Sequence, residues 1–129
     1  MISVDTNIII RFLTRDDERQ YKKSFTIFNS KEIFIADTVI LETEWVLRYA
    51  YQFSGDQICT AFRKLLGLKN VHITAPTIIA QAIDWHERGM DFADALHLAN
   101  SQQYPTFYTF DKQFISKSKN LTHCKVTLP

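Results

Sequence analysis

The sequence is poor in the residues that interrupt secondary structure. Its 129 residues include only three glycines and three prolines, which argues against disordered or low-complexity segments. Cys59 and Cys124 stand without CxxC spacing, so we expect reduced core thiols and neither a disulfide framework nor a zinc site. No apolar run approaches the roughly 20 residues that span a bilayer, and the first residues lack the pattern of a signal peptide. We therefore expect a cytoplasmic protein that does not associate with membranes.

Length and composition favour a single domain over residues 1–129. Hydrophobic residues make up 46% of the chain, which is enough for a sizeable core at this length. The 15 basic and 14 acidic side chains nearly balance, so the net charge predicts no partner. If several acids gathered around a metal ion, the remaining surface would be basic and would suit a polyanion.

Apolar periodicity predicts short strands that alternate with helices. The expected strands cover residues 2–4, 32–37, 71–74, 107–110 and 124–128. The expected helices cover residues 7–13, 15–30, 39–51, 55–68, 75–89 and 91–103. This order favours an α/β fold with a parallel sheet covered by helices on both faces, which is a three-layer α/β/α sandwich.

The same pattern predicts helix boundaries and core positions. Asp37 or Thr38 can cap the helix over residues 39–51, because short polar side chains accept hydrogen bonds from the first helical turn. Aromatic side chains at helical spacing are expected in the core. They are Phe25, Phe28, Phe62 and Trp85.

Four acidic residues stand within or beside apolar segments. Asp5 interrupts the run MISVDTNIII, and Glu42 lies in VILETEWVL. Asp94 lies between two alanines in DFADALHLA, and Asp111 directly follows a strand in FYTFDKQF. An ionised group costs several kcal/mol to bury unless a partner or a metal holds it. Asp5 is also expected beyond the carboxyl end of a strand, where α/β folds place their sites.

A shared metal ion would explain these four acids together. Carboxylates that are brought together repel one another, which raises some of their pKa values, and a hard divalent cation such as Mg²⁺ removes that conflict. Carboxylates that leave coordination positions open also leave room for a phosphate oxygen and an attacking water. That arrangement performs metal-assisted hydrolysis of phosphodiesters.

Each acid also has a simpler explanation when it is considered alone. Asp5 can cap the following turn, and Asp111 suits a turn after a strand. Glu42 can be a solvated helix residue, and Asp94 can pair with another helix. Asp91 is a natural N-cap for the helix that holds Asp94. The metal hypothesis therefore depends on the order and context of all four acids.

Four motifs, taken in order, resemble one known family. They are VDTNIII, VILETEWVL, GMDFADALHLA and TFDKQF, and they extend over almost the whole chain. Single motifs of this kind are common, whereas all four in this order within 129 residues are specific. The sequence resembles the PIN-domain ribonucleases, and among them the VapC-like toxins of type II toxin–antitoxin pairs.

The resemblance implies a PIN-like fold and a site for Mg²⁺ or Mn²⁺. The positions that match the family's metal-binding catalytic acids are Asp5, Glu42, Asp94 and Asp111. The positions that match residues near the substrate or around the acids are Thr6, Asn7 and Thr109. Asp91 is a second acid one turn before Asp94, and we expect Asp94 to be the closer ligand because the alanines beside it leave space.

The resemblance also implies partners and products. We expect an RNA substrate, a homodimer, and a small cognate antitoxin that lies over the site. A water activated by the metal would attack the phosphate in line and leave a 5′-phosphate and a 3′-hydroxyl.

Several residues near the four acids have two explanations each. His97, one turn after Asp94, can support the metal site or be a partly buried histidine. Arg11, Arg15 and Arg48 can contact phosphates or be solvated. The same alternatives apply to the basic residues near the last acid, Lys112, Lys117 and Lys119. No interleaved aromatic and basic residues mark a base-stacking surface.

Three other functions stay open at this point. The sequence does not favour a phosphatase or a phosphotransfer receiver, because Asp5 is followed by Thr6 and Asn7 without a second acid. A catalytically silent RNA- or protein-binding module would share the fold. A metal-dependent nuclease that acts on single-stranded DNA would share the site chemistry.

Overall fold

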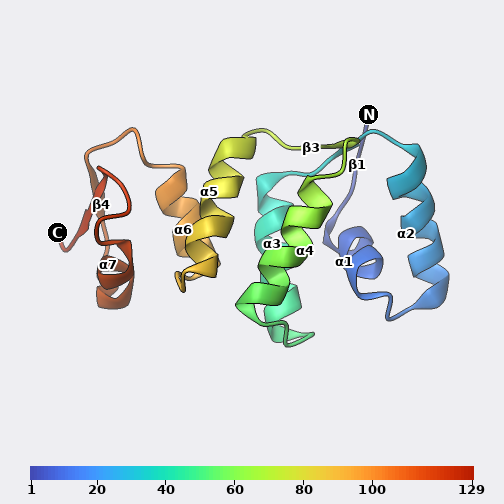
Figure 1. The fold of residues 1–129 in the computed structure, drawn as a ribbon, viewed down its shortest axis with the longest axis horizontal. Helices are drawn as coiled ribbons and strands as arrows, with labels where there is room; N and C mark the ends of the chain where they lie inside the picture. Colours follow the sequence, from blue (N-terminus) through green and yellow to red (C-terminus); the bar gives the residue numbers. More distant parts are fainter. The chain divides into compact units, whose positions relative to one another are not determined.

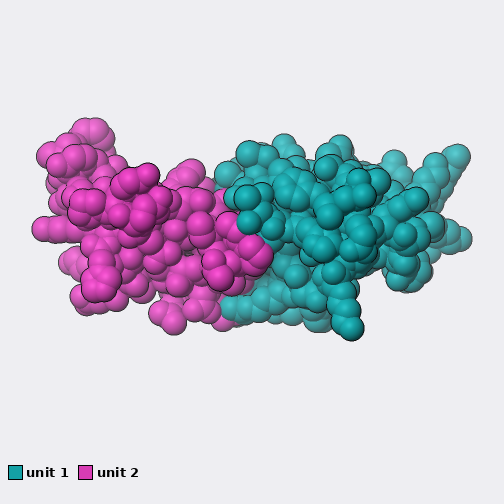
Figure 2. Space-filling view, turned by 90° about the horizontal axis from the view of Figure 1, so that it is seen from above, with its two compact units in different colours: residues 1–74 teal, residues 75–129 magenta.

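The computed structural model describes all 129 residues and contains seven helices and five strands. The chain forms two compact units, residues 1–74 and residues 75–129. Figure 1 shows the order of the elements and Figure 2 colours the two units. We describe each unit by itself.

Unit 1 contains a three-stranded parallel sheet in the order β1-β2-β3. Its strands are β1 (Ile2–Ser3), β2 (Ile33–Phe34) and β3 (Val71–His72). Its helices are α1 (Thr6–Thr14), α2 (Glu18–Ser30), α3 (Asp37–Tyr49) and α4 (Gly55–Leu66). The register pairs Ile33 with Ile2 on one side and with Val71 on the other. Parallel neighbours need long crossovers, and here a pair of helices makes each one.

The four helices of unit 1 form a connected layer. Helix α1 packs against both α2 and α3, and α3 packs against α4. Crossovers between parallel strands are right-handed, so strands in sequential order place both helix pairs on the same face of the sheet. Ile33 and Ile35 are fully buried while Phe34 between them is only half-buried, which is the alternation expected of a sheet with one closely covered face.

Unit 2 contains a two-stranded parallel sheet and three helices. The elements are α5 (Pro76–Glu87), α6 (Phe92–Ala99), β4 (Thr106–Tyr108), α7 (Lys112–Ser118) and β5 (Lys125–Thr127). Helix α5 packs on α6, and α7 packs on β5. The rings of Phe107 and Phe114 meet edge to face with centroids 5.3 Å apart. This contact fixes α7 against β4.

The expected α/β class with parallel strands is confirmed, and the expected boundaries are partly wrong. All strand pairs are parallel, but each strand is shorter than the apolar run that predicted it. Helix α3 begins after Ala36, which makes no side-chain cap, so the predicted cap at Asp37 or Thr38 is wrong. Helix α7 was not predicted, because it buries only Phe114 and Ser118 and so carries no helical apolar period.

The predicted aromatic core is confirmed at three positions and wrong at one. Phe28, Phe62 and Trp85 are buried, whereas Phe25 is 47% exposed. Helix α2 turns Ser24 and Phe28 inward, and Phe28 stacks on Phe12 with ring centroids 4.2 Å apart. Phe25 is one position beyond that inward face. The spacing of Phe25 correctly predicted a helix, but its position around the helix axis places its side chain in solvent.

Two further expectations concern cysteines and membranes. Cys59 and Cys124 are buried and form no disulfide, as expected for core thiols. None of the helices is both long and apolar enough to cross a lipid bilayer.

The contrast between Phe62 and Phe25 predicts different costs of truncation. Phe62→Ala should lower the free energy of unfolding by about 3–5 kcal/mol, because a fully buried ring leaves a cavity. Phe25→Ala, which removes an exposed ring, should cost about 1 kcal/mol or less. Urea unfolding followed by circular dichroism measures both. Equal losses for the two variants would contradict the burial described here.

Candidate active site

Asp5 lies just beyond the carboxyl end of β1 and caps helix α1. Its carboxylate accepts a hydrogen bond from the backbone N–H of Ile8 at 3.3 Å. The side chain is exposed, so the apolar run around it does not bury it. The N-terminus of a helix carries partial positive charge, which favours an anion at this position. The capping explanation for Asp5 is therefore confirmed, and the cap leaves the carboxylate open to solvent.

Thr6 connects the first acid to the second. The Thr6 side chain is buried, and its hydroxyl donates a hydrogen bond to Oε1 of Glu42. Glu42 is exposed on α3, and α3 packs against α1. Asp5 precedes Thr6 in the chain, so the structure brings two predicted acids of unit 1 to one place. Asn7 is exposed in the first turn of α1 beside them.

In unit 2, three acids lie close enough to affect one another. The pKa of Asp94 is raised, first by partial burial and then by the negative charges of Asp91 and Asp111. The charge of His97 opposes this shift. His97 is exposed, so the expectation of a partly buried histidine is wrong. The structure thus brings together the two predicted acids of this unit.

Asp91 and Asp111 are both helix caps. Asp91 accepts a hydrogen bond from the backbone N–H of Asp94 at 3.1 Å, which confirms the predicted cap of α6. Asp111 caps α7 by accepting from the backbone N–H groups of Gln113 and Phe114, at 2.9 and 3.2 Å. Which of Asp91 and Asp94 is the closer ligand stays a prediction.

Thr109 fixes the turn that presents Asp111. Its hydroxyl accepts a hydrogen bond from the Asp111 backbone N–H at 3.0 Å. Its own backbone N–H donates to the carbonyl oxygen of Thr127 at 3.0 Å, which continues the β4–β5 ladder by one residue. The position of Asp111 is therefore set by the sheet, by Thr109 and by the start of α7.

The donor set suits a hard divalent cation. The predicted ligands in both units are carboxylates, and Mg²⁺ prefers oxygen ligands in an octahedral arrangement that includes water. Within neither unit are three or more His, Cys, Asp or Glu side chains close enough together to hold a metal ion. Two of the predicted acids belong to unit 1 and two belong to unit 2, and the oxygen donors of all four suit such an ion by their chemistry.

Both arginines that follow Asp5 are engaged in ion pairs. Arg11 contacts Asp16 at 3.0 Å and Arg15 contacts Glu18 at 2.9 Å. Arg11 also donates to the hydroxyl of Tyr51. That hydroxyl, together with Thr14 and Arg11, lowers the pKa of Asp16. These pairs fasten the end of α1 and give Arg11 and Arg15 structural partners.

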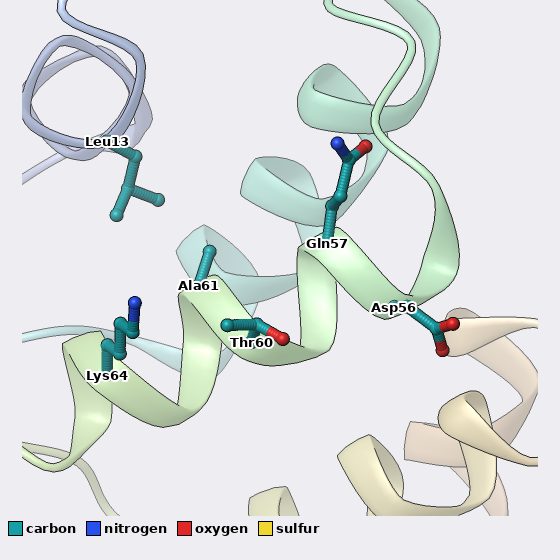
Figure 3. A pocket seen from close by; sticks show the side chains of 6 residues that line it. All are labelled: Leu13, Asp56, Gln57, Thr60, Ala61 and Lys64. Atoms are coloured by element: carbon teal, nitrogen blue, oxygen red, sulfur yellow. The ribbon is translucent and has the colours of Figure 1, made fainter.

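An open pocket in unit 1 is separate from the predicted site residues. It has a volume of about 420 Å³ and lies between Leu13 of α1 and one side of α4 (Figure 3). Its remaining lining residues are Asp56, Gln57, Thr60, Ala61 and Lys64. None of the predicted site residues lines it, so it adds nothing to the candidate active site.

Helix α3 carries features that the sequence analysis missed, and the expectation that aromatic and basic residues are not interleaved is wrong at Trp45, Arg48 and Tyr49. Glu44, two residues after Glu42, is only 1% exposed and pairs with Arg48 through Nε at 3.0 Å. On the outside of the helix, the rings of Trp45 and Tyr49 are exposed and adjacent. Their i, i+4 spacing was the available indication, because residues at that spacing meet on a helix surface.

The raised pKa of Asp94 predicts a stability change with a definite sign. A carboxyl whose pKa is higher in the folded than in the unfolded protein destabilises the fold when it is ionised. Asp94→Asn should therefore raise the thermal midpoint at pH 7 in metal-free buffer. The gain should disappear at acid pH, below the ordinary carboxyl pKa of about 4. Differential scanning fluorimetry over this pH range measures it.

Asp56→Asn is the matched control for this measurement. Asp56 also stands in the first turn of its helix, α4, where a negative charge is favourable. This variant should show no gain at pH 7. A loss of stability in Asp94→Asn equal to that of the control would contradict the charge cluster.

Comparison with known proteins gives the family. The model of the PIN domain family matches residues 2–120. None of the curated protein sequences matches the chain. One similar solved structure is the VapC20 toxin of Mycobacterium tuberculosis, a Sarcin-Ricin loop cleaving toxin. It is 21% identical, with 97% of this chain and 99% of that chain covered and a TM-score of 0.45. The family match confirms the expected PIN-like fold class: the chain belongs to the PIN domain family.

Proposed function

We propose that this protein is an endoribonuclease that depends on Mg²⁺ or Mn²⁺ and acts as the VapC-like toxin of a toxin–antitoxin pair. Membership of the PIN family supports a nuclease of the hydrolase class. The observation that carries the proposal is the local grouping of the predicted acids. The Thr6 hydroxyl, next to Asp5 in the chain, donates a hydrogen bond to Glu42. The negative charge of Asp111 contributes to the raised pKa of Asp94. Acids whose charges oppose one another, as those of Asp94 and Asp111 do, suit a bound cation better than separate structural roles.

In this proposal four carboxylates bind the metal: Asp5, Glu42, Asp94 and Asp111. A bound Mg²⁺ or Mn²⁺ supplies positive charge to the scissile phosphate and lowers the pKa of an attacking water. Asp5 and Asp111 are fixed by backbone N–H groups of α1 and α7, so little motion is needed before they bind. Asp94 releases its proton more readily once a cation offsets the neighbouring charges.

Four further residues position these ligands or meet the substrate in the proposal. Thr6 orients Glu42 through its hydroxyl, and Thr109 sets the turn before Asp111. Asp91 fixes the first turn of α6. Asn7 is exposed beside Asp5 and can donate its amide hydrogens to a phosphate oxygen.

The proposed partners follow from the same assignment. The substrate is RNA, cut at a phosphodiester bond, and a cognate antitoxin covers the site until it is removed. We propose a homodimer in the cytoplasm, within a single domain over residues 1–129. The alternative functions are a catalytically silent binding module and a nuclease for single-stranded DNA. The following assays distinguish both from an endoribonuclease.

The first activity prediction concerns Asp5 and the metal. Asp5→Asn should abolish cleavage of single-stranded RNA, since an amide binds Mg²⁺ far more weakly than a carboxylate does. Chelation of divalent cations should have the same effect on the wild type, and added Mg²⁺ or Mn²⁺ should restore it. Gel analysis of RNA fragments, with the 5′-phosphate identified by a phosphate-dependent exonuclease, measures these outcomes.

Asp17→Asn provides the control for exchanging an aspartate for an asparagine at a helix cap. Asp17 caps α2 through the backbone N–H of Gln20 at 3.0 Å, as Asp5 caps α1. This variant should keep full activity, because asparagine also caps helices. Equal activity of the Asp5 and Asp17 variants would contradict the proposed site, and cleavage of DNA alone would reassign its substrate.

The second activity prediction concerns the hydroxyl of Thr6. Thr6→Val keeps the shape of the side chain but removes the hydrogen bond to Glu42, so cleavage should fall roughly 10- to 100-fold, as for other supports of metal ligands. Thr6→Ser retains the hydroxyl and should recover most of the loss. The metal concentration for half-maximal activity should rise in Thr6→Val alone. If Thr6→Ser cleaved RNA as slowly as Thr6→Val, the loss would come from changed packing and not from the missing hydroxyl.

A further inference from the structure

An exposed aromatic pair lies on helix α3. The side chains of Trp45 and Tyr49 are 56% and 60% exposed. Their ring centroids are 5.0 Å apart with an interplanar angle of 47°, so each ring supports the other. Large apolar rings held together at the surface indicate a binding surface more often than a structural role.

The aromatic pair shares a helix face with Glu42. Glu42, Trp45 and Tyr49 stand at positions i, i+3 and i+7, which fall on one side of a helix. The opposite side carries the buried residues Ile40, Thr43 and Leu47. At about 1.5 Å per residue, the stripe from position 42 to position 49 extends about 10 Å. The aromatic surface therefore begins beside a proposed metal ligand.

A guanidinium that is paired with a buried carboxylate borders this surface. The guanidinium of Arg48 lies 4.7 Å from the centre of the Tyr49 ring. Arg48 is held in place by Glu44, through Nε at 3.0 Å and through its second terminal nitrogen at 3.2 Å. Because Glu44 is buried, the pair orients the guanidinium plane over the aromatic ring. A guanidinium beside two adjacent rings that are tilted by 47° forms a surface on which a base can stack.

We propose that Trp45 and Tyr49 stack an unpaired base of the RNA next to the bond that is cut. This inference rests on the proposed function and names the substrate form that the site selects. Every base has a face that stacks on an aromatic ring, whereas bases within a duplex are covered by their neighbours. The surface thus favours single-stranded segments and accepts different bases. A second copy of this chain on the same face is the alternative that the experiment must distinguish.

Tryptophan fluorescence provides a direct test, because the chain has only two tryptophans. Trp85 is 2% exposed and is shielded from a ligand on α3, so quenching by RNA reports Trp45. The titration uses a 12-nucleotide single-stranded RNA of mixed sequence in the Asp5→Asn background with Mg²⁺, which prevents cleavage. We expect quenching by this RNA and little quenching by a blunt RNA duplex of the same length. Equal quenching by the duplex would overturn the proposal.

Substitutions then separate the surface from the catalytic site. Trp45→Ala in the otherwise wild-type chain should raise KM for single-stranded RNA roughly fivefold to hundredfold, the range of one lost stacking contact. Trp45→Phe should recover most of the affinity. Phe25→Ala, which removes an exposed ring from α2, should leave KM unchanged. At saturating RNA, the Mg²⁺ concentration for half-maximal cleavage should be equal in Trp45→Ala and the wild type, because the ring is proposed to hold a base and not the metal.

The possible failures are distinguishable. RNA cleavage by the wild type with unchanged KM in Trp45→Ala would refute the aromatic surface while the nuclease assignment stands. Quenching of Trp45 by single-stranded RNA in a chain that cuts no RNA would refute the nuclease assignment and retain the surface. Conversion of a dimer to a monomer by Trp45→Ala in analytical ultracentrifugation, with RNA affinity unchanged, would identify a contact between copies and overturn the proposal.

Discussion

Repulsion between neighbouring carboxylates is the constraint on which the site in this protein depends. Asp94 is partly buried near Asp91 and Asp111, and their charges raise its pKa. A fold selected for stability alone would separate these groups or pair each with a base. The energetic conflict persists because helix starts and a strand end fix the acids where they are. A bound cation would remove the conflict, which is the physical basis of the metal site that we propose.

In the proposed site, the residues that cap helices are also the residues that would bind the metal. Asp5 and Asp111 each accept backbone hydrogen bonds at a helix start, and each comes soon after a parallel strand. The backbone of a helix start is fixed by its sheet, and the cap transfers that rigidity to the carboxylate. A cap uses few of the acceptor positions of a carboxylate, and the others stay available for an ion. The two explanations that sequence left as alternatives are thus compatible.

Sequence predicted what depends on short-range patterns. Alternating strands and helices, the parallel pairing and the caps at Asp5 and Asp91 all follow from local composition. Which side of a helix faces the core was harder to predict, as Phe25 shows. Phe25 and Phe28 share a helical spacing, but the side of α2 that faces inward depends on its contact with α1. The hydrogen bond from Thr6 to Glu42 joins two helices, and no local sequence pattern predicts it. The grouping of all four acids still stands as a prediction.

In helix α3, two glutamates that are only two residues apart lie on different sides of the helix and have different surroundings. Glu42 and Glu44 are identical in type and differ by about 200° around the helix axis. Glu44 is buried against Arg48, and Glu42 is exposed with Thr6 as its partner. Because Glu44 binds Arg48 from within, the guanidinium is fixed outside beside Tyr49. One carboxylate is thus used for structure so that the other, with the aromatic rings on its own side of the helix, remains available for ligands.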